Sequence, residues 1–254
     1  MDNFRSWIDE DRQVLPTYWR GQTDPDWPLA SSFEREILRL GTGGLKSSNI
    51  YPYDNRYKRE GRRIWEEGFY DAIRDRYLEA FKSFAAGMRG VNPTPLDTDQ
   101  WWALGRHYGL VTPLLDWSES PYIAAFFPLT EMLSRMTTSS GISFSGGEIA
   151  LYRLFHNKQL EGDGLRVIRP RVEELSRMHG QRGLFTWLNS EEFFELQGFL
   201  ENTGRGDLLT KVTISDQAVL DGLRDLRSHG IDYKLLFPDL TGAAQSANTR
   251  WDVI

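Results

Sequence analysis

Hydrophobic and polar positions alternate along the chain in short runs separated by turns, a pattern typical of a domain with both strands and helices. Residues 14–22 form an apolar run that ends in Arg20-Gly21-Gln22, which predicts a strand closed by a glycine turn. Residues 57–88 carry an aromatic or aliphatic side chain every three to four positions, which predicts a long helix with one face toward a core.

The stretch from residue 101 to residue 127 is the part around which we expect the rest of the chain to fold. Its pattern predicts the end of a helix, a turn at Gly109, a short apolar strand over residues 114–117 and a polar turn. A buried helix that begins at Pro121 follows. This order of elements is that of an α/β packing unit.

The second half of the chain predicts further strands, and their apolar runs are too continuous for half-exposed ones. Strands are expected at residues 148–154, 165–170 and 208–214, and residues 177–188 are expected to end a polar helix and enter a further strand. A polar loop is expected at 139–147, a helix at 217–227, and the start of a C-terminal tail at 235–240. About six strands with helices before and between them predict an α+β fold. We expect one domain over residues 1–254, with a curved or split mixed β-sheet flanked by helices.

The composition narrows the chemistry. The 254 residues include no cysteine, which excludes disulfides, thiolate metal sites and a cysteine nucleophile, and the four histidines have no metal-binding spacing. The first residues lack the apolar core of a signal peptide and no long apolar stretch follows, so we expect a cytoplasmic protein without a membrane anchor. A net charge of −6 argues against a broad surface for nucleic acid, but it leaves room for a local basic cleft.

Four polar clusters lie at predicted strand ends or turns: Arg20-Gly21-Gln22, His107-Tyr108, Asp116 with Ser118 and Ser120, and Gln181-Arg182-Gly183. Each has an ordinary structural interpretation, because a lone arginine often forms a surface ion pair and a serine before a helix often caps it. A triad of Ser118, His107 and Asp116 lacks the Gly-x-Ser-x-Gly elbow. Because each cluster ends a different strand or turn, we expect Arg20, Asp116, Ser118 and Gln181 to converge in one cleft.

Taken together, four motifs resemble the FRG domain family, which is named for a Phe-Arg-Gly motif. They are Tyr-Trp-Arg-Gly-Gln at 18–22, His-Tyr-Gly-Leu-x-Thr-x-Leu-Leu-Asp-Trp-x-x-Ser-Pro at 107–121, Gln-x-Gly-x-Phe-Thr at 181–186 and Leu-Phe-Pro-Asp-Leu-x-Gly at 236–242. Trp19 replaces the phenylalanine, an exchange of one aromatic residue for another. The resemblance covers about residues 15–245.

The layout of the FRG domain is similar to that of ADP-ribosyltransferases of the Arg-Ser-Glu type, which implies their fold and NAD as the cofactor. In this resemblance Arg20 is the arginine, and Ser118-Glu119-Ser120 is the serine-rich turn. Gln181 and Gly183 stand where a Glu-x-Glu pair is expected, so the catalytic carboxylate is missing from its usual place. Either Asp116 or another acid such as Glu191 or Glu192 substitutes, or Gln181 positions the substrate, or the domain performs no transfer.

The expected catalytic residues are therefore Arg20, Ser118, Asp116 and Gln181, and the expected cofactor-binding residues are Arg20, Gly21, Gln22, His107, Tyr108, Ser118, Ser120 and Tyr122. The resemblance implies a bacterial toxin or anti-phage effector that modifies RNA, DNA or protein, with an antitoxin protein as a partner. The alternatives are a non-catalytic module that binds nucleotides or nucleic acid, and a hydrolase of NAD or nucleic acid. The basic run at residues 56–63 either faces such an acceptor or is a solvated helix face.

Overall fold

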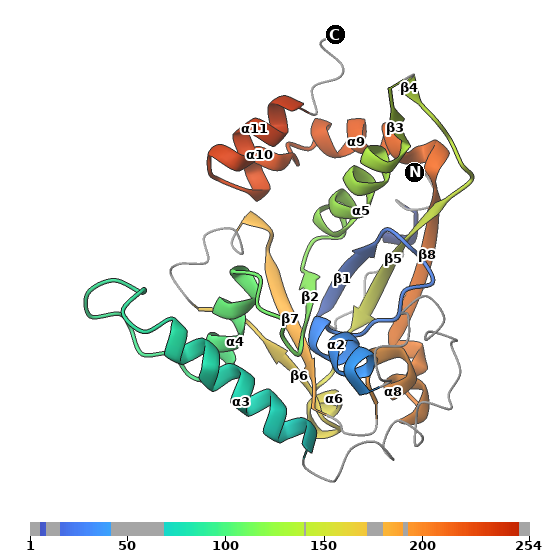
Figure 1. Cartoon of the computed structure of the whole chain (residues 1–254). Coiled ribbons are helices and arrows are strands. Elements are labelled where there is room, and N and C mark those ends of the chain that lie inside the picture. The colour runs from blue at the N-terminus through green and yellow to red at the C-terminus, as the bar shows by residue number, and fades with distance from the viewer. Residues whose placement is uncertain are drawn as a thin grey trace.

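A computed structural model of the chain describes residues 6–8, 16–41, 69–139, 141–171, 180–189 and 193–248. The strands of the main sheet are β1 (Thr17–Gln22), β2 (Leu114–Ser118), β5 (Glu148–Phe155), β6 (Leu165–Ile168), β7 (Gly183–Leu188) and β8 (Leu209–Ser215). They form one six-stranded sheet in the order β6-β7-β2-β1-β5-β8 (Figure 1). The predicted α+β, single-domain architecture is confirmed, because strands from across the sequence share this one sheet.

Neighbouring strands of the main sheet all run antiparallel, so the expected mixed sheet is wrong in this detail. The reason is the position of β1, which lies between β2 and β5 and is antiparallel to both. Strands β2 and β5 are therefore parallel to each other, but β1 separates them. The expected loop at residues 139–147 also contains part of a small hairpin, formed by β3 (Thr137–Thr138) and β4 (Gly141–Ile142).

The described helices are α2 (Ser32–Gly41), α3 (Phe69–Phe84), α4 (Thr98–His107), α5 (Pro121–Met136), α6 (Lys158–Gly162), α8 (Leu196–Asn202), α9 (Val219–Ser228), α10 (Tyr233–Leu236) and α11 (Leu240–Asn248). Helix α3 occupies only part of the helix expected over residues 57–88: turns follow Phe84, and residues 57–68 lie outside the described residues. The basic run at 56–63, Glu191 and Glu192 also lie outside them. Residues 235–240 do not begin a tail, because they belong to the α10–α11 pair.

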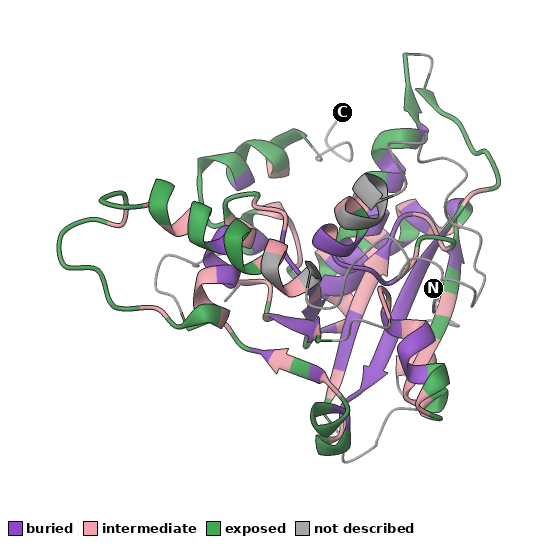
Figure 2. Ribbon diagram, turned by 60° about the horizontal axis from the view of Figure 1, so that its bottom comes forward, coloured by how far each residue is buried: buried purple, intermediate pink, exposed green. Residues whose placement is uncertain are grey.

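Three hydrophobic clusters hold the helices on the sheet, and Figure 2 shows the buried strands enclosed by helices with exposed outer faces. The first cluster joins α5, α9 and α10 to β5, and the second joins α3 and α4 to β2 and β7. Alternation along the strands puts these two clusters on one face of the sheet, and the third, with α6 and α8, on the other. None of the helices in the described ranges is long and apolar enough to span a membrane.

The centre of the sheet is split between β1 and β2. These strands pair only at Trp19 and Ser118, whereas β1 pairs with β5 along its whole length from Thr17 to Gln22. Beyond Trp19 the two strands diverge, and a side chain takes the place of the missing backbone bonds: Nη1 of Arg20 donates to the carbonyl oxygen of Asp116 at 2.8 Å. The predicted split of the sheet is therefore present, and it lies beside the Arg20-Gly21-Gln22 cluster.

Helix α5 lies directly on β1, and Gly21 makes this close approach possible. Pro128 has no N–H to donate to the carbonyl of Ala124, and this free carbonyl faces Gly21. A Cβ atom at Gly21 would stand 2.3 Å from the Ala124 oxygen and 2.5 Å from Cγ of Pro128. The glycine is thus required by helix packing.

Candidate functional site

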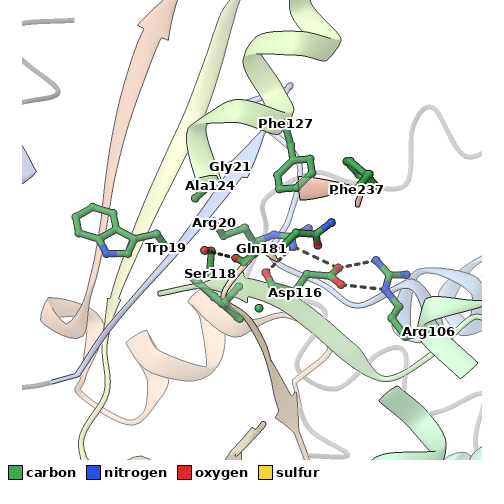
Figure 3. A pocket seen from close by; sticks show the side chains of 12 residues that line it. Trp19, Arg20, Gly21, Arg106, Asp116, Ser118, Ala124, Phe127, Gln181 and Phe237 are labelled. Atoms are coloured by element: carbon green, nitrogen blue, oxygen red, sulfur yellow. Dashed lines mark hydrogen bonds and ion pairs between the residues drawn. The ribbon is translucent and has the colours of Figure 1, made fainter. Parts of the chain in front are cut away.

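A pocket of about 360 Å³ lies over the split between β1 and β2 (Figure 3). It is lined by Trp19, Arg20, Gly21, Arg106, Asp116, Trp117, Ser118, Ala124, Phe127, Gln181, Gly183 and Phe237. The four side chains expected to converge, Arg20, Asp116, Ser118 and Gln181, all contribute to it, which confirms that prediction. The sheet brings them together because β1, β2 and the turn before β7 are neighbours in space.

A carboxylate held by two arginines forms the polar side of the pocket. Arg106, in the last turn of α4, binds Asp116 with two hydrogen bonds, from Nε to Oδ1 at 3.1 Å and from Nη2 to Oδ2 at 2.5 Å. Arg20 is farther away, with 3.7 Å between its Nη1 and Oδ2 of Asp116. With both arginines protonated and Asp116 ionised, the group has one net positive charge, which favours an anionic ligand.

Arg20 is the arginine of this group with a whole terminal nitrogen, Nη2, that has no partner among the described residues. Its side chain is 17% exposed, and its Nε lies 3.4 Å from Oε1 of Gln22. Within the ranges that the structure describes, no partner is found for its Nη2. A guanidinium that lines a pocket with an unused donor group is suited to bind a phosphate or carboxylate.

Burial and charge act in opposite directions on these groups. Burial lowers the pKa of Arg20 to about 10, although the neighbouring Asp116 raises it, so Arg20 stays protonated at neutral pH. The charge of Asp116 raises the pKa of Arg106. Burial raises the pKa of Asp116, but Arg106 and Arg20 outweigh this effect and the pKa lies below its ordinary value. Asp116 is therefore ionised at neutral pH.

Ser118 and Gln181 connect β2 to the turn before β7. The Ser118 hydroxyl donates to the main-chain oxygen of Gln181 at 2.8 Å and accepts from the N–H of Ser120 at 3.1 Å. The side-chain Nε2 of Gln181 donates to the carbonyl oxygen of Leu236 at 3.3 Å. Arg182, between two residues that line the pocket, has a φ of 47°, a left-handed conformation that is uncommon for arginine. This turn holds α10 next to the pocket.

Phe127 and Phe237 form the apolar side of the pocket (Figure 3). Phe127 projects from α5 and is 37% exposed. Phe237 follows α10, and the two rings meet edge to face with 6.4 Å between their centroids. An exposed ring in a concave site offers a surface on which a planar ligand can stack.

Five residues expected to bind the cofactor are not among those that line the pocket: Gln22, His107, Tyr108, Ser120 and Tyr122. Gln22 is buried and donates to the carbonyl of Trp27, and Ser120 caps α5 by accepting from the N–H of Ile123. The ring of Tyr122 stacks on His229, and the rings of His107 and Tyr108 pack edge to face. In each case the structure favours the ordinary structural interpretation.

Sequence reasoning did not single out Arg106, Phe127 or Phe237, which supply a charge and two rings to the pocket. A signal existed for two of them: Arg106 directly precedes the His-Tyr-Gly motif, and Phe237 lies inside the Leu-Phe-Pro-Asp motif. Phe127 gave no signal, because its ring continues the apolar pattern of a buried helix.

The chain was compared with protein families, curated proteins and solved structures. The model of the FRG domain matches residues 16–136, which run from β1 to the end of α5. The resemblance to the FRG domain is therefore confirmed for residues 16–136. No curated protein and no solved structure matches it. The FRG match includes Arg20, Arg106, Asp116, Ser118 and Phe127, whereas the pocket is completed by residues beyond it.

The ion pair in the FRG domain predicts a defined pH dependence of stability. Because the folded-state pKa of Asp116 is lowered, its contribution is present above the unfolded-state pKa of about 3.9 and is lost as the pH falls through the folded value. We expect Asp116→Asn to be less stable by about 1 kcal/mol at pH 7, a modest value because the side chain is 42% exposed, and the difference to shrink below about pH 4. Urea unfolding of both proteins between pH 7 and 2.5 measures this. Parallel pH profiles would contradict it.

Proposed function

We propose that the pocket binds NAD and that the protein is an ADP-ribosyltransferase-like enzyme that modifies a macromolecule. The observation that carries this proposal is the position of Arg20 at the split in the sheet, with Nη2 unpaired in the described part of the chain and the exposed ring of Phe127 lining the same pocket. A charged donor and an aromatic surface in one pocket are what a phosphate joined to a planar base requires.

The residues of the pocket fit NAD in their chemistry. Arg20 is the group that would bind a phosphate, and the net positive charge of the arginine–aspartate group favours such an anion. Phe127 and Phe237 would pack against a base or the nicotinamide ring. The side chain of Gln181 donates to the carbonyl of Leu236, and its main-chain oxygen accepts from Ser118. These two hydrogen bonds keep this wall of the pocket in place.

When bound, NAD supplies an ADP-ribosyl group through cleavage of the bond between nicotinamide and ribose. Such a cleavage develops positive charge on the ribose, which a nearby carboxylate stabilises. Among the described residues that line the pocket, Asp116 is the only acid. In this proposal Asp116 therefore takes the place of the catalytic glutamate of the Glu-x-Glu pair, which was expected where Gln181 and Gly183 stand. Arg106 keeps Asp116 ionised by lowering its pKa.

The experiment that tests the proposal uses the purified chain with NAD labelled in its adenylate half, alone and with a bacterial extract. Label that enters protein, RNA or DNA supports a transferase and identifies the class of acceptor. Label that appears only as free ADP-ribose points to a hydrolase. NAD that neither binds nor is consumed refutes the proposal. A transferase that modifies an essential macromolecule would also fit the toxin or anti-phage role implied by the family resemblance.

One observation favours a second candidate, a module that binds nucleotides without chemistry. Asp116 accepts two hydrogen bonds from Arg106, one from Nε and one from Nη2, so much of its negative charge is already compensated. Gln181 provides an amide where a carboxylate is expected. A pocket of this kind keeps the means to bind an anion even if it cannot stabilise a cation.

The variant Asp116→Asn separates the two candidates. If Asp116 stabilises the transition state, its loss should lower NAD turnover by about 100-fold or more while NAD affinity is retained. Rates of nicotinamide release and the dissociation constant for NAD are measured on one preparation, with the melting temperature as a check on folding. Full turnover in the folded variant would remove Asp116 from the catalytic role.

A further inference from the structure

Two arginines, Arg106 and Arg20, lie near the Asp116 carboxylate in the pocket, and the distances show that Arg106 is the one hydrogen-bonded to it. Arg106 holds both oxygens of Asp116, whereas the nearest contact of Arg20 with this carboxylate is 3.7 Å. Arg20 is instead fixed to the main chain, through the carbonyl of Asp116 at 2.8 Å. Arg20 contacts Asp116 through Nη1 (Figure 3), and its Nη2 has no partner among the described residues.

Arg106 is itself held in the orientation that this arrangement needs. Its Nη1 lies 3.4 Å from the hydroxyl of Ser32, and the same hydroxyl accepts from the N–H of Thr112 at 3.0 Å. The side chain of Arg106 is 30% exposed, so the surrounding protein shields most of it from water. These contacts tie the end of α4 and the start of α2 to the segment before β2.

We propose that Arg106 is a positioning residue that keeps the Asp116 carboxylate away from Arg20, so that Nη2 of Arg20 remains available to an anionic ligand. This inference rests on the proposed anion site at Arg20. In this proposal Arg106 does not bind the ligand, and it changes the affinity for the anion only through its contact with Asp116. In this arrangement Arg106 neutralises Asp116, and Arg20 binds the anion.

The physical reason lies in what Asp116 does without Arg106. A carboxylate in a partly buried pocket needs a positive partner, and the next one is Arg20, only 3.7 Å away. A small side-chain rotation would form a close ion pair between them, since arginine and carboxylate match each other with two hydrogen bonds. An incoming phosphate would have to displace Asp116 from Arg20, and its affinity would fall.

The experiment measures binding of inorganic pyrophosphate and of NAD by calorimetry to four proteins: the unchanged chain, Arg106→Met, Asp116→Asn, and the double variant. We expect Arg106→Met to weaken pyrophosphate binding about 10-fold or more, because the freed carboxylate occupies Arg20. Asp116→Asn should bind at least as tightly as the unchanged chain. The double variant should return to within about threefold of it, because no charged acid remains to compete.

Arg35→Met is the matched control for charge alone. Arg35 also influences the pKa of Arg20 by its charge, but its Nη1 donates to the carbonyl of Ala30 and no contact with Asp116 is found. Its replacement removes one positive charge and leaves Asp116 on Arg106, so pyrophosphate affinity should change by about twofold or less. A loss as large as that of Arg106→Met would show that net charge, and not position, is responsible, and would overturn the inference.

The remaining outcomes are also decisive. A double variant that binds as weakly as Arg106→Met would mean that Arg106 contacts the anion directly. No pyrophosphate binding by the unchanged chain would likewise overturn the inference. If the protein binds pyrophosphate but not NAD, the proposed function is refuted. The inference about Arg106 is then still tested by the recovery of pyrophosphate affinity in the double variant. If Arg106→Met does not fold, Arg106→Lys replaces it: lysine cannot hold both oxygens, so affinity should fall by a smaller factor and recover with Asp116→Asn.

Discussion

Arg20→Gln is expected to lower the affinity for NAD by about 100-fold or more, the largest effect of any single change in the pocket. Glutamine keeps a polar side chain with an amide donor at the split between β1 and β2, although it is shorter than arginine. It lacks the charge and the second terminal nitrogen that would bind a phosphate. The dissociation constant for NAD is measured by calorimetry, together with the melting temperature.

Arg224→Gln is the control for this change. Arg224 is also an arginine paired with an aspartate, Asp221, but it is 73% exposed on α9 and does not line the pocket. Its replacement should leave both NAD affinity and stability unchanged. If Arg20→Gln is folded and binds NAD as tightly as this control, the anion site lies elsewhere and the proposed function loses the observation that carries it.

Gly21→Ala is expected to destabilise the fold by about 3 kcal/mol or more, because an added methyl group must push α5 away from β1. Its nearest neighbour would be the Ala124 carbonyl oxygen at 2.3 Å, a backbone atom that cannot move by a side-chain rotation. The second neighbour, Pro128, has a rigid ring. Urea unfolding measures the free energy, and nicotinamide release should fall with the folded fraction.

Gly162→Ala provides the comparison in the same chain. Gly162 ends α6, and no atom would stand within 4 Å of an added Cβ there. This change should be neutral or slightly stabilising, since alanine loses less conformational entropy on folding. Equal stability of Gly21→Ala and Gly162→Ala would show that α5 can shift without cost. In that case the glycine of the FRG motif would need an explanation in ligand binding.

The sequence predicted the strands around the pocket well, because each is a continuous apolar run bounded by glycine, proline or polar residues. The convergence of Arg20, Asp116, Ser118 and Gln181 was predicted from their expected positions at strand ends and turns. Arg20 and Asp116 lie within β1 and β2 instead, and they meet because these two strands are neighbours at the centre of the sheet.

Closeness in sequence was an incomplete guide to the pocket. Gln22 is only two residues from Arg20, yet its amide binds the Trp27 carbonyl and is buried. Tyr122 follows the serine-rich turn, but its ring stacks on His229 of the helix α9 end. The direction of a side chain depends on the helix or strand that packs against it, and the local sequence pattern does not reveal which element that is.

Arg106 could not be assigned because an arginine in the last turn of a helix has a sufficient local explanation, the interaction with the helix dipole. Phe237 could not be assigned because α10 is a single short turn that periodicity does not detect. Arg106 contacts Asp116 only ten residues away, whereas Phe237 meets Phe127 from a distant part of the chain. Only the three-dimensional arrangement shows that one holds the acid and the other lines the same pocket.

The central position of β1 has a consequence for how the chain folds. It pairs with β2 only at Ser118 and with β5 along its full length, so this first strand of the described residues cannot complete its pairing until β5 has been made. Strand β2 in turn waits for Trp187 of β7. Such non-local pairing makes folding slow and leaves unpaired strand edges exposed on the ribosome. A fragment that ends with the FRG match at residue 136 would contain β1 and β2 but lack β5 and β7, with which they form most of their pairs, so the family boundary is not a folding boundary.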